Sequence, residues 1–111
     1  MAGVQDTKVI DVVGEGPDGE VIMFIVEERP WGASPSQVDD LREKLITYAG
    51  FVADRSLVRH YPDLEGRPVR IQIDCPEQPT DAIAALIDQA APSLAEFGIS
   101  LSFNVRGPHA P

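Results

Sequence analysis

The run VIMFIV at positions 21–26 is apolar at every residue, and it constrains the fold more than any other segment. Side chains of a β-strand alternate between the two faces of a sheet, so a strand with one buried face needs an apolar residue only at every second position. One set of alternate residues, Val21, Met23 and Ile25, can face the core. The other set is Ile22, Phe24 and Val26, and this second apolar row needs a cover of its own.

Two kinds of cover are open for the second row. Within the chain, the N-terminal arm, the loop around Trp31 or long neighbouring side chains can shield it. The other cover is a protein partner, including a second copy in a twofold homodimer, because apolar surface left in water costs about 25 cal/mol per Å² relative to burial. Trp31 lies in a Pro-Gly loop, where a large aromatic side chain either pins the loop to the core or anchors a partner. The candidate interface residues are Ile22, Phe24, Val26 and Trp31.

The rest of the chain predicts three further strands. Residues 8–13 form a hairpin with residues 20–27 across the turn sequence GEGPDG. Residues 69–75 and 99–105 alternate between apolar and polar side chains, so each strand has one core face and one polar face. Their inward-facing residues are Val69, Ile71, Ile73, Cys75, Ile99, Leu101, Phe103 and Val105.

The first predicted helix begins in the sequence SPSQ at positions 34–37. Ser34 and Gln37 are placed to bond each other's main-chain amides in a capping box, and proline suits the first helical position. Apolar residues at helical spacing carry this helix to about Asp54. Its charged residues, Lys44 among them, are expected on the surface.

A second amphipathic helix is predicted between the last two strands. Thr80 caps its start and Gly98 closes its end. Proline inside a helix removes a hydrogen bond, so we expect a kink or a break at Pro92.

The predicted order of elements is ββαβαβ. Strands that alternate with helices favour right-handed crossovers between parallel strands. We therefore expect an α+β fold, a two-layer sandwich in which both helices cover one face of a four-stranded mixed sheet and leave the other face open. The 111 residues form a single domain, with an ordered core at about 7–105 and a loose tail at 106–111.

Basic residues gather between positions 55 and 70 of an otherwise acidic chain. Arginines can hold a carboxylate or a phosphate through forked hydrogen bonds. The candidate anion-binding residues are His60, Tyr61, Arg67 and Arg70. The competing interpretation is that the arginines pair with neighbouring carboxylates, which are Asp54, Asp63, Glu65 and Asp74.

Charge and composition exclude several classes of partner. A formal net charge of −9 repels phosphate backbones, which argues against nucleic acid. No apolar run approaches the roughly 20 residues of a membrane span, and the N-terminus lacks the pattern of a signal peptide. We therefore expect a cytoplasmic protein that does not bind membranes, and the single cysteine agrees with that compartment.

Residues with catalytic or metal-binding chemistry do not form a recognised pattern. Cys75 ends an inward-facing row and is expected in the core, and no nucleophile is arranged with His60. Two distant histidines and one cysteine make no metal site of nitrogen and sulfur ligands. We expect no metal, no cofactor and no catalytic residue; the pattern leans against an enzyme and leaves that question open.

Several segments resemble a family of small bacterial proteins that is catalogued only as a domain of unknown function. They are TKVIDVVG, GEVIMFIVEE, a tryptophan before the first helix, LREKLITYAGFV, YPDLEGRPVRIQID followed by PT, and GISLSFNV. The similarity extends from about Thr7 to Val105, and its most distinctive piece is Tyr61-Pro62-Asp63 with Gly66-Arg67. The resemblance implies a bacterial cytoplasmic protein. It brings no activity, so it assigns no role to any residue.

Two functions remain open at this point. The first is a protein-interaction module that acts through self-association or association with another protein. The alternative is a domain that binds a small molecule or an anion, centred on Tyr61, Arg67 and Arg70.

Overall fold

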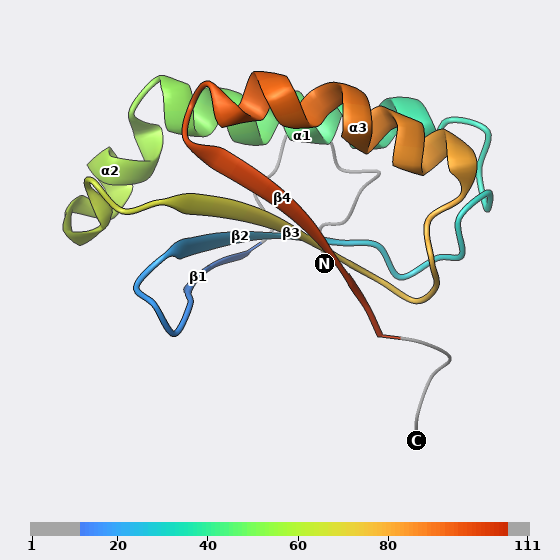
Figure 1. Ribbon diagram of the computed structural model, residues 1–111, viewed down its shortest axis with the longest axis horizontal. Helices are drawn as coiled ribbons and strands as arrows, with labels where there is room; N and C mark the ends of the chain where they lie inside the picture. The colour runs from blue at the N-terminus through green and yellow to red at the C-terminus, as the bar shows by residue number, and fades with distance from the viewer. Residues whose placement is uncertain (1–11, 107–111) are drawn as a thin grey trace.

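The structure, a computed structural model, describes residues 12–106. Two strands come first, followed by a helical region, a third strand, a long helix and a last strand (Figure 1). In chain order the elements are β1 (Val12–Glu15), β2 (Val21–Val26), α1 (Gln37–Ala53), α2 (Ser56–His60), the 3-10 turn η1 (Pro62–Leu64), β3 (Val69–Cys75), α3 (Asp81–Ala95) and β4 (Ile99–Val105).

The strands form one mixed sheet in the order β1-β2-β3-β4. β1 pairs with β2 in the antiparallel sense, whereas β2 with β3 and β3 with β4 are parallel. Figure 1 shows α1 and α3 on one face of the sheet, where the two helices contact each other, so the molecule has two layers. The predicted α+β sandwich with a four-stranded mixed sheet is confirmed, and the structure adds the strand order and the short helix α2, which were not predicted.

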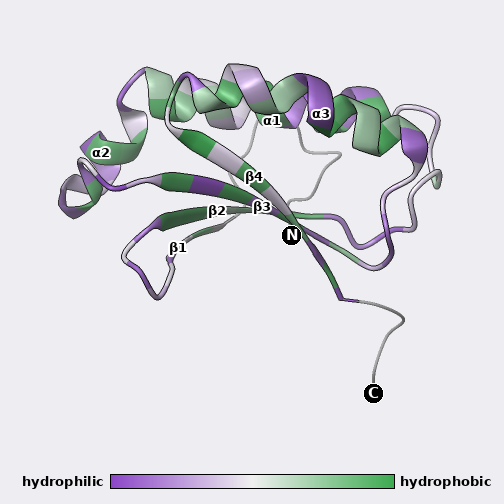
Figure 2. Ribbon diagram, in the orientation of Figure 1, coloured by the Kyte–Doolittle hydropathy of each residue, from purple (hydrophilic) through white to green (hydrophobic). Residues whose placement is uncertain are grey.

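The core lies between the sheet and the two long helices. β3 alternates strictly between buried and partly exposed residues, as predicted, and Figure 2 shows the same alternation of hydropathy. On β4 the predicted inward residues all pack against the core, but only Ile99 is fully buried. The reason is that β4 is an edge strand with a neighbour on one side.

The strands of the hairpin differ from the prediction in their bounds. β1 continues through Gly14 and Glu15, which pair with Ile22 and Val21, so the connecting loop is shorter than GEGPDG. The amide of Gly16 donates to the carbonyl of Glu20 at 2.8 Å and closes the turn. Residues 8–11 of the predicted first strand lie outside the described residues, as do residues 107–111 of the predicted tail.

The predicted capping box at the start of α1 is wrong. The helix begins at Gln37, and Ser36 at the N-cap makes no side-chain capping bond. The Gln37 side chain instead turns inward, where its Oε1 accepts from the amide of Gly32 at 2.6 Å and its Nε2 donates to Glu27 at 3.0 Å. Buried polar groups need hydrogen-bond partners, and here the Gln37 side chain bonds Glu27 and the Gly32 amide instead of capping the helix.

Lys44 also departs from the prediction, because it is fully buried rather than on the surface. Its Nζ lies 5.8 Å from the centre of the Tyr48 ring, within the range of a cation–π contact. Lys44 stands three residues after Leu41 and four before Tyr48, which is a position on the buried stripe of the helix, but its charge led the prediction to place it on the surface.

The second long helix has the predicted cap, because Oγ1 of Thr80 accepts from the amide of Ile83 at 3.4 Å. The predicted break at Pro92 is wrong, since α3 is continuous from Asp81 to Ala95. Pro92 and Asp88, whose carbonyl loses its donor to the proline, are both exposed. Water can bond that carbonyl, which makes the proline tolerable there.

Candidate functional site

The sheet face opposite the helices is the first candidate site, and we call it the open face. It consists of the residues of β2, β3 and β4 that alternate with the core residues. None of the described helices lies over it (Figure 1). Its members are Ile22, Phe24, Val26, Arg70, Gln72, Asp74, Ser100, Ser102 and Asn104.

The apolar row of the open face is partly covered by its own chain. Phe24 lies against the backbone of β1, since a Cβ at Gly14 would be 3.2 Å from Cε2 of Phe24. Ile22 is 7% exposed and lies in register with Arg70, whose long stem is placed to cover it. Phe24 and Val26 remain partly exposed. Neighbouring groups of the same chain therefore shield part of the row, and the rest of it faces outward.

The polar row on β3 carries one cation and one anion. Nε of Arg70 is buried and has no hydrogen-bond partner. Asp74 is held in place, because its Oδ1 accepts from Nε2 of Gln72 at 2.9 Å and from Nδ2 of Asn104 at 3.0 Å. Within residues 12–106, the second carboxylate oxygen of Asp74 accepts no hydrogen bond. This face therefore offers a buried donor without a partner, and an acceptor oxygen that none of the described residues bonds, four residues apart on one strand.

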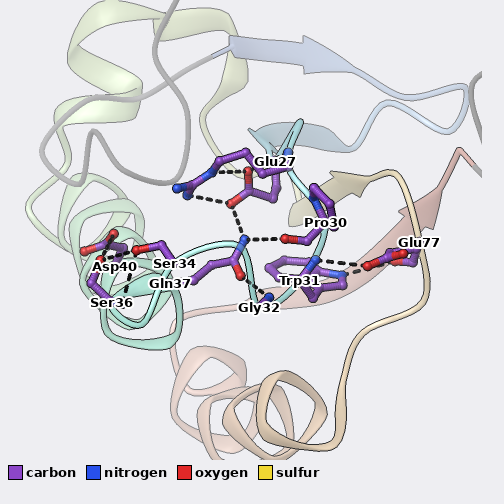
Figure 3. Close-up of polar contacts among 10 residues, drawn as sticks. Glu27, Pro30, Trp31, Gly32, Ser34, Ser36, Gln37, Asp40 and Glu77 are labelled. Atoms are coloured by element: carbon purple, nitrogen blue, oxygen red, sulfur yellow. Dashed lines mark hydrogen bonds and ion pairs between the residues drawn. The ribbon is translucent and has the colours of Figure 1, made fainter.

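Trp31, the fourth candidate interface residue, is 6% exposed and belongs to the core cluster. Its amide donates to Oε1 of Glu77 and its indole Nε1 donates to the Glu77 carbonyl, both at 3.1 Å (Figure 3). These bonds tie the loop after β2 to the loop after β3. In this position the side chain offers little surface to a partner.

A buried carboxylate, Glu27, organises the same end of the sheet (Figure 3). It accepts from the amide, Nε and Nη2 of Arg29 at 3.0–3.1 Å and from Nε2 of Gln37 at 3.0 Å. Burial alone raises the pKa of this carboxyl, but the hydrogen bonds from Arg29 and Gln37 together outweigh burial and hold the pKa below its usual value. Both carboxylate oxygens of Glu27 accept hydrogen bonds from within the chain, so the cluster stabilises the loop. The sequence interpretation missed Glu27 and Gln37; a charged residue next to the apolar run was the one available signal.

The basic segment pairs largely with carboxylates of the same chain. Arg67 Nη1 contacts Oε2 of Glu15 at 2.9 Å, and Arg55 forms an ion pair with Glu65. Tyr61 is 45% exposed and borders, with Glu15, a surface hollow of about 360 Å³. Glu15 thus pairs with Arg67 and borders the same hollow as Tyr61.

The remaining anion-site candidates, His60 and Arg70, contact different parts of the chain. His60 packs edge-on against Phe51, with ring centres 5.7 Å apart, and its Nδ1 lies 3.2 Å from the carbonyl of Ser56. Arg70 lies on the open face, in register with Ile22 and Ser100. Among the described residues, no hydrogen bond joins any two of the predicted anion-site residues.

The remaining chemistry-bearing residues form no reactive arrangement. Cys75 is fully buried, and burial raises the pKa of its thiol. In the part of the chain that the structure describes, no three His, Cys, Asp or Glu side chains are grouped to hold a metal ion. Over the same residues, no helix is both long enough and apolar enough to cross a membrane.

A second apolar surface lies between α1 and α3 and was not predicted. It is a groove of about 230 Å³, bordered by Ile46, which is 65% exposed, and by Phe97, which is 51% exposed. The signal available in the sequence was the position of Ile46, which follows Leu45 directly and so falls outside the regular apolar stripe of the helix.

These features define a class of protein: a small two-layer α+β domain with helices on one face of its sheet and, among residues 12–106, a row of apolar, basic and acidic residues without a helix over it on the other. The chain belongs to a family described as "Family of unknown function (DUF6572)", whose model matches residues 2–107. This membership confirms the resemblance to a family without an assigned activity. No curated protein and no solved structure matches the chain.

Proposed function

We propose that this protein is a protein-interaction module and that its docking surface is the open face of the sheet. One observation carries the proposal. The Nε of Arg70 is buried without a hydrogen-bond partner, next to Ile22, on a face that none of the described helices covers.

The energetic argument rests on the cost of an unsatisfied donor. A buried polar group without a hydrogen bond costs about 1–3 kcal/mol. A partner that supplies an oxygen can draw the Arg70 guanidinium out of its buried position, which removes that cost, and at the same time covers Phe24 and Val26, which are partly exposed. The open face therefore gains from docking both in hydrogen bonding and in apolar burial.

Contacts within the chain argue against Trp31 as part of the docking surface and against the basic segment as an anion-binding site. Trp31 is buried and bonded to Glu77 within the chain, so the proposed surface is confined to the sheet. A domain that binds an anion through Tyr61, Arg67 and Arg70 is the alternative function. Arg67 already pairs with Glu15, and an anion would have to displace that carboxylate.

We also place this activity in the bacterial cytoplasm. A buried free thiol such as Cys75 stays reduced in that compartment.

Site-specific photo-crosslinking in the native host tests the proposal. A benzophenone amino acid replaces Ser100, which is exposed on the open face, and a matched variant carries it at Gln89, which is exposed on α3. We expect adducts of higher mass from position 100 and none of the same mass from position 89. Identical adduct patterns, or no adduct from position 100, contradict the proposal. Mass spectrometry of the adduct tells whether the captured chain is another protein or a second copy.

A further inference from the structure

We infer that the partner of the open face is a second copy of this chain, docked face to face about a twofold axis that passes near Gln72. This inference rests on the proposed function and names the partner. In the complex, Arg70 of each copy pairs with Asp74 of the other.

The order of side chains along β3 sets the geometry. Arg70, Gln72 and Asp74 lie on the same face of the strand, with glutamine in the middle. Two residues of a strand span about 6.6 Å, so the cation and the anion lie about 13 Å apart along it. When two such strands face each other in antiparallel directions with Gln72 opposite Gln72, Arg70 of each copy lies opposite Asp74 of the other. Parallel directions would place arginine over arginine, so charge selects the antiparallel arrangement.

The hydrogen-bonding state of the two residues fits this pairing. Arg70 has a buried Nε without a partner and makes no ion pair among the described residues. Asp74 is oriented by Gln72 and Asn104, which both bond to Oδ1 and leave Oδ2 for an incoming donor. A guanidinium can approach such a carboxylate with two parallel hydrogen bonds. Each copy thus supplies the group that the other lacks.

The charge of the open face permits a second copy to approach. The whole chain has a formal net charge of −9, so two copies repel each other at most surfaces. The nine positions of the open face contain one arginine and one aspartate and no other charged residue, so this face is formally neutral. A partner with a strongly basic surface would find more acidic surface elsewhere on the molecule, whereas a copy of the chain finds a matching neutral face here.

The size of the face predicts a weak dimer. Three strands at about 4.8 Å spacing and six residues at about 3.3 Å give a footprint of roughly 300 Å² per copy. Standard protein interfaces bury about 800 Å² per partner. We therefore expect association that depends on concentration between about 10 and 500 µM.

Charge reversal tests the inference. Arg70→Asp places two acidic residues on the face and Asp74→Arg places two basic residues there, so neither single variant can pair with itself. A one-to-one mixture of the two variants restores both ion pairs, as does the double variant with itself. By sedimentation equilibrium we expect association of the mixture and of the double variant, and at least about tenfold weaker self-association of each single variant. Arg42→Asp on the helical side is the control and is expected to associate like wild type.

A cross-link at the axis gives an independent measurement that does not depend on charge. Gln72→Cys places a thiol opposite its own copy, and a short bis-maleimide should join the two chains, whereas Gln89→Cys on α3 should stay uncoupled. Wild type, which carries only the buried Cys75, measures the background of cross-linking at that thiol. Circular dichroism establishes that each variant is folded, and if a charge-reversal variant is not, the Gln72→Cys result decides alone.

The results separate failure of the dimer from failure of the docking surface. A wild type that stays monomeric at 500 µM, or a mixture of single variants that does not associate, overturns the homodimer. If photo-crosslinking at position 100 then captures a different protein, the open face remains a docking surface and the inference about the partner is wrong. If it captures nothing, both proposals fail.

Discussion

The indole Nε1 of Trp31 donates to the main-chain carbonyl of Glu77 at 3.1 Å, across 46 residues of sequence. The amide of Trp31 donates to the side-chain Oε1 of the same glutamate. One residue thus satisfies both N–H groups of the tryptophan and joins the loops that follow β2 and β3. The aromatic residue serves here as a clamp between two crossovers of the sheet.

Removing the indole N–H should weaken this clamp. Trp31→Phe keeps an aromatic ring in the core but loses the bond to Glu77 and some buried area, so we expect the free energy of unfolding to fall by about 1–2 kcal/mol. Urea denaturation followed by circular dichroism measures the change. Tyr61→Phe, at a 45% exposed position, is the matched aromatic control and should change stability by less than about 0.5 kcal/mol. Equal effects of the two variants would show that the clamp is energetically unimportant.

The Glu27 cluster should make stability depend on pH in acid. The folded protein holds the pKa of Glu27 below the ordinary value of 4.5, because the bonds from Arg29 and Gln37 outweigh burial. A lowered pKa in the folded state means that the stabilisation is complete above pH 4.5 and disappears as the pH falls through the lowered pKa. Glu27→Gln removes the charge, so we expect it to cost about 2 kcal/mol at pH 7 and progressively less below pH 4.

Urea denaturation of wild type and Glu27→Gln at a series of pH values measures this difference. Asp54 also has a lowered pKa, from its bonds to Ser56, so wild type alone would mix two contributions. The difference between the two proteins isolates Glu27. A difference that stays constant from pH 7 to pH 2 would contradict the assignment.

Much of the architecture was predictable from side-chain periodicity, most directly where a strand has one buried face and one polar face. β3 lies in the interior of the sheet with helices on one side, so its alternation of apolar and polar residues determined both its bounds and its buried face. The cap of α3 was predictable for a similar reason, since Thr80 satisfies an amide within its own helix. Local interactions leave a local pattern in the sequence.

The parts that were missed depend on contacts between distant residues. Gln37 has the spacing of a capping residue, yet Glu27 and the amide of Gly32 bind its side chain in the folded protein. Lys44 lies among charged neighbours in the sequence and is fully buried by the tertiary fold. On the candidate site, the row of Ile22, Phe24 and Val26 was evident from the strand pattern. The unsatisfied Nε of Arg70 was not, because a sequence does not show which donors lack acceptors.

The thiol of Cys75 should react only when the protein opens. The side chain is fully buried, and burial raises the pKa of the thiol, which lowers the fraction of reactive thiolate. We expect at least about 100-fold slower reaction with a disulfide reagent at pH 8 in the folded protein than in urea. Absorbance of the released thiolate measures the rate. A fast reaction in the absence of urea would show that β3 and β4 open readily at their carboxyl ends.

Replacing Arg70 should stabilise the isolated chain while it weakens docking. Arg70→Met keeps a long apolar stem over Ile22 and removes the buried Nε that has no partner. Because the cost of that unsatisfied donor disappears, we expect the free energy of unfolding to rise by about 1 kcal/mol, measured by urea denaturation at low micromolar concentration where the chain is monomeric. Sedimentation equilibrium at high concentration should show weaker self-association of the same variant, since the ion pair with Asp74 of the second copy is lost. Arg42→Met, at an exposed position of α1, is the control and should leave both measurements unchanged within about 0.5 kcal/mol. A variant that loses stability at low concentration would mean that Arg70 is already satisfied within one chain, and the open face would then have no unpaired donor to offer a partner.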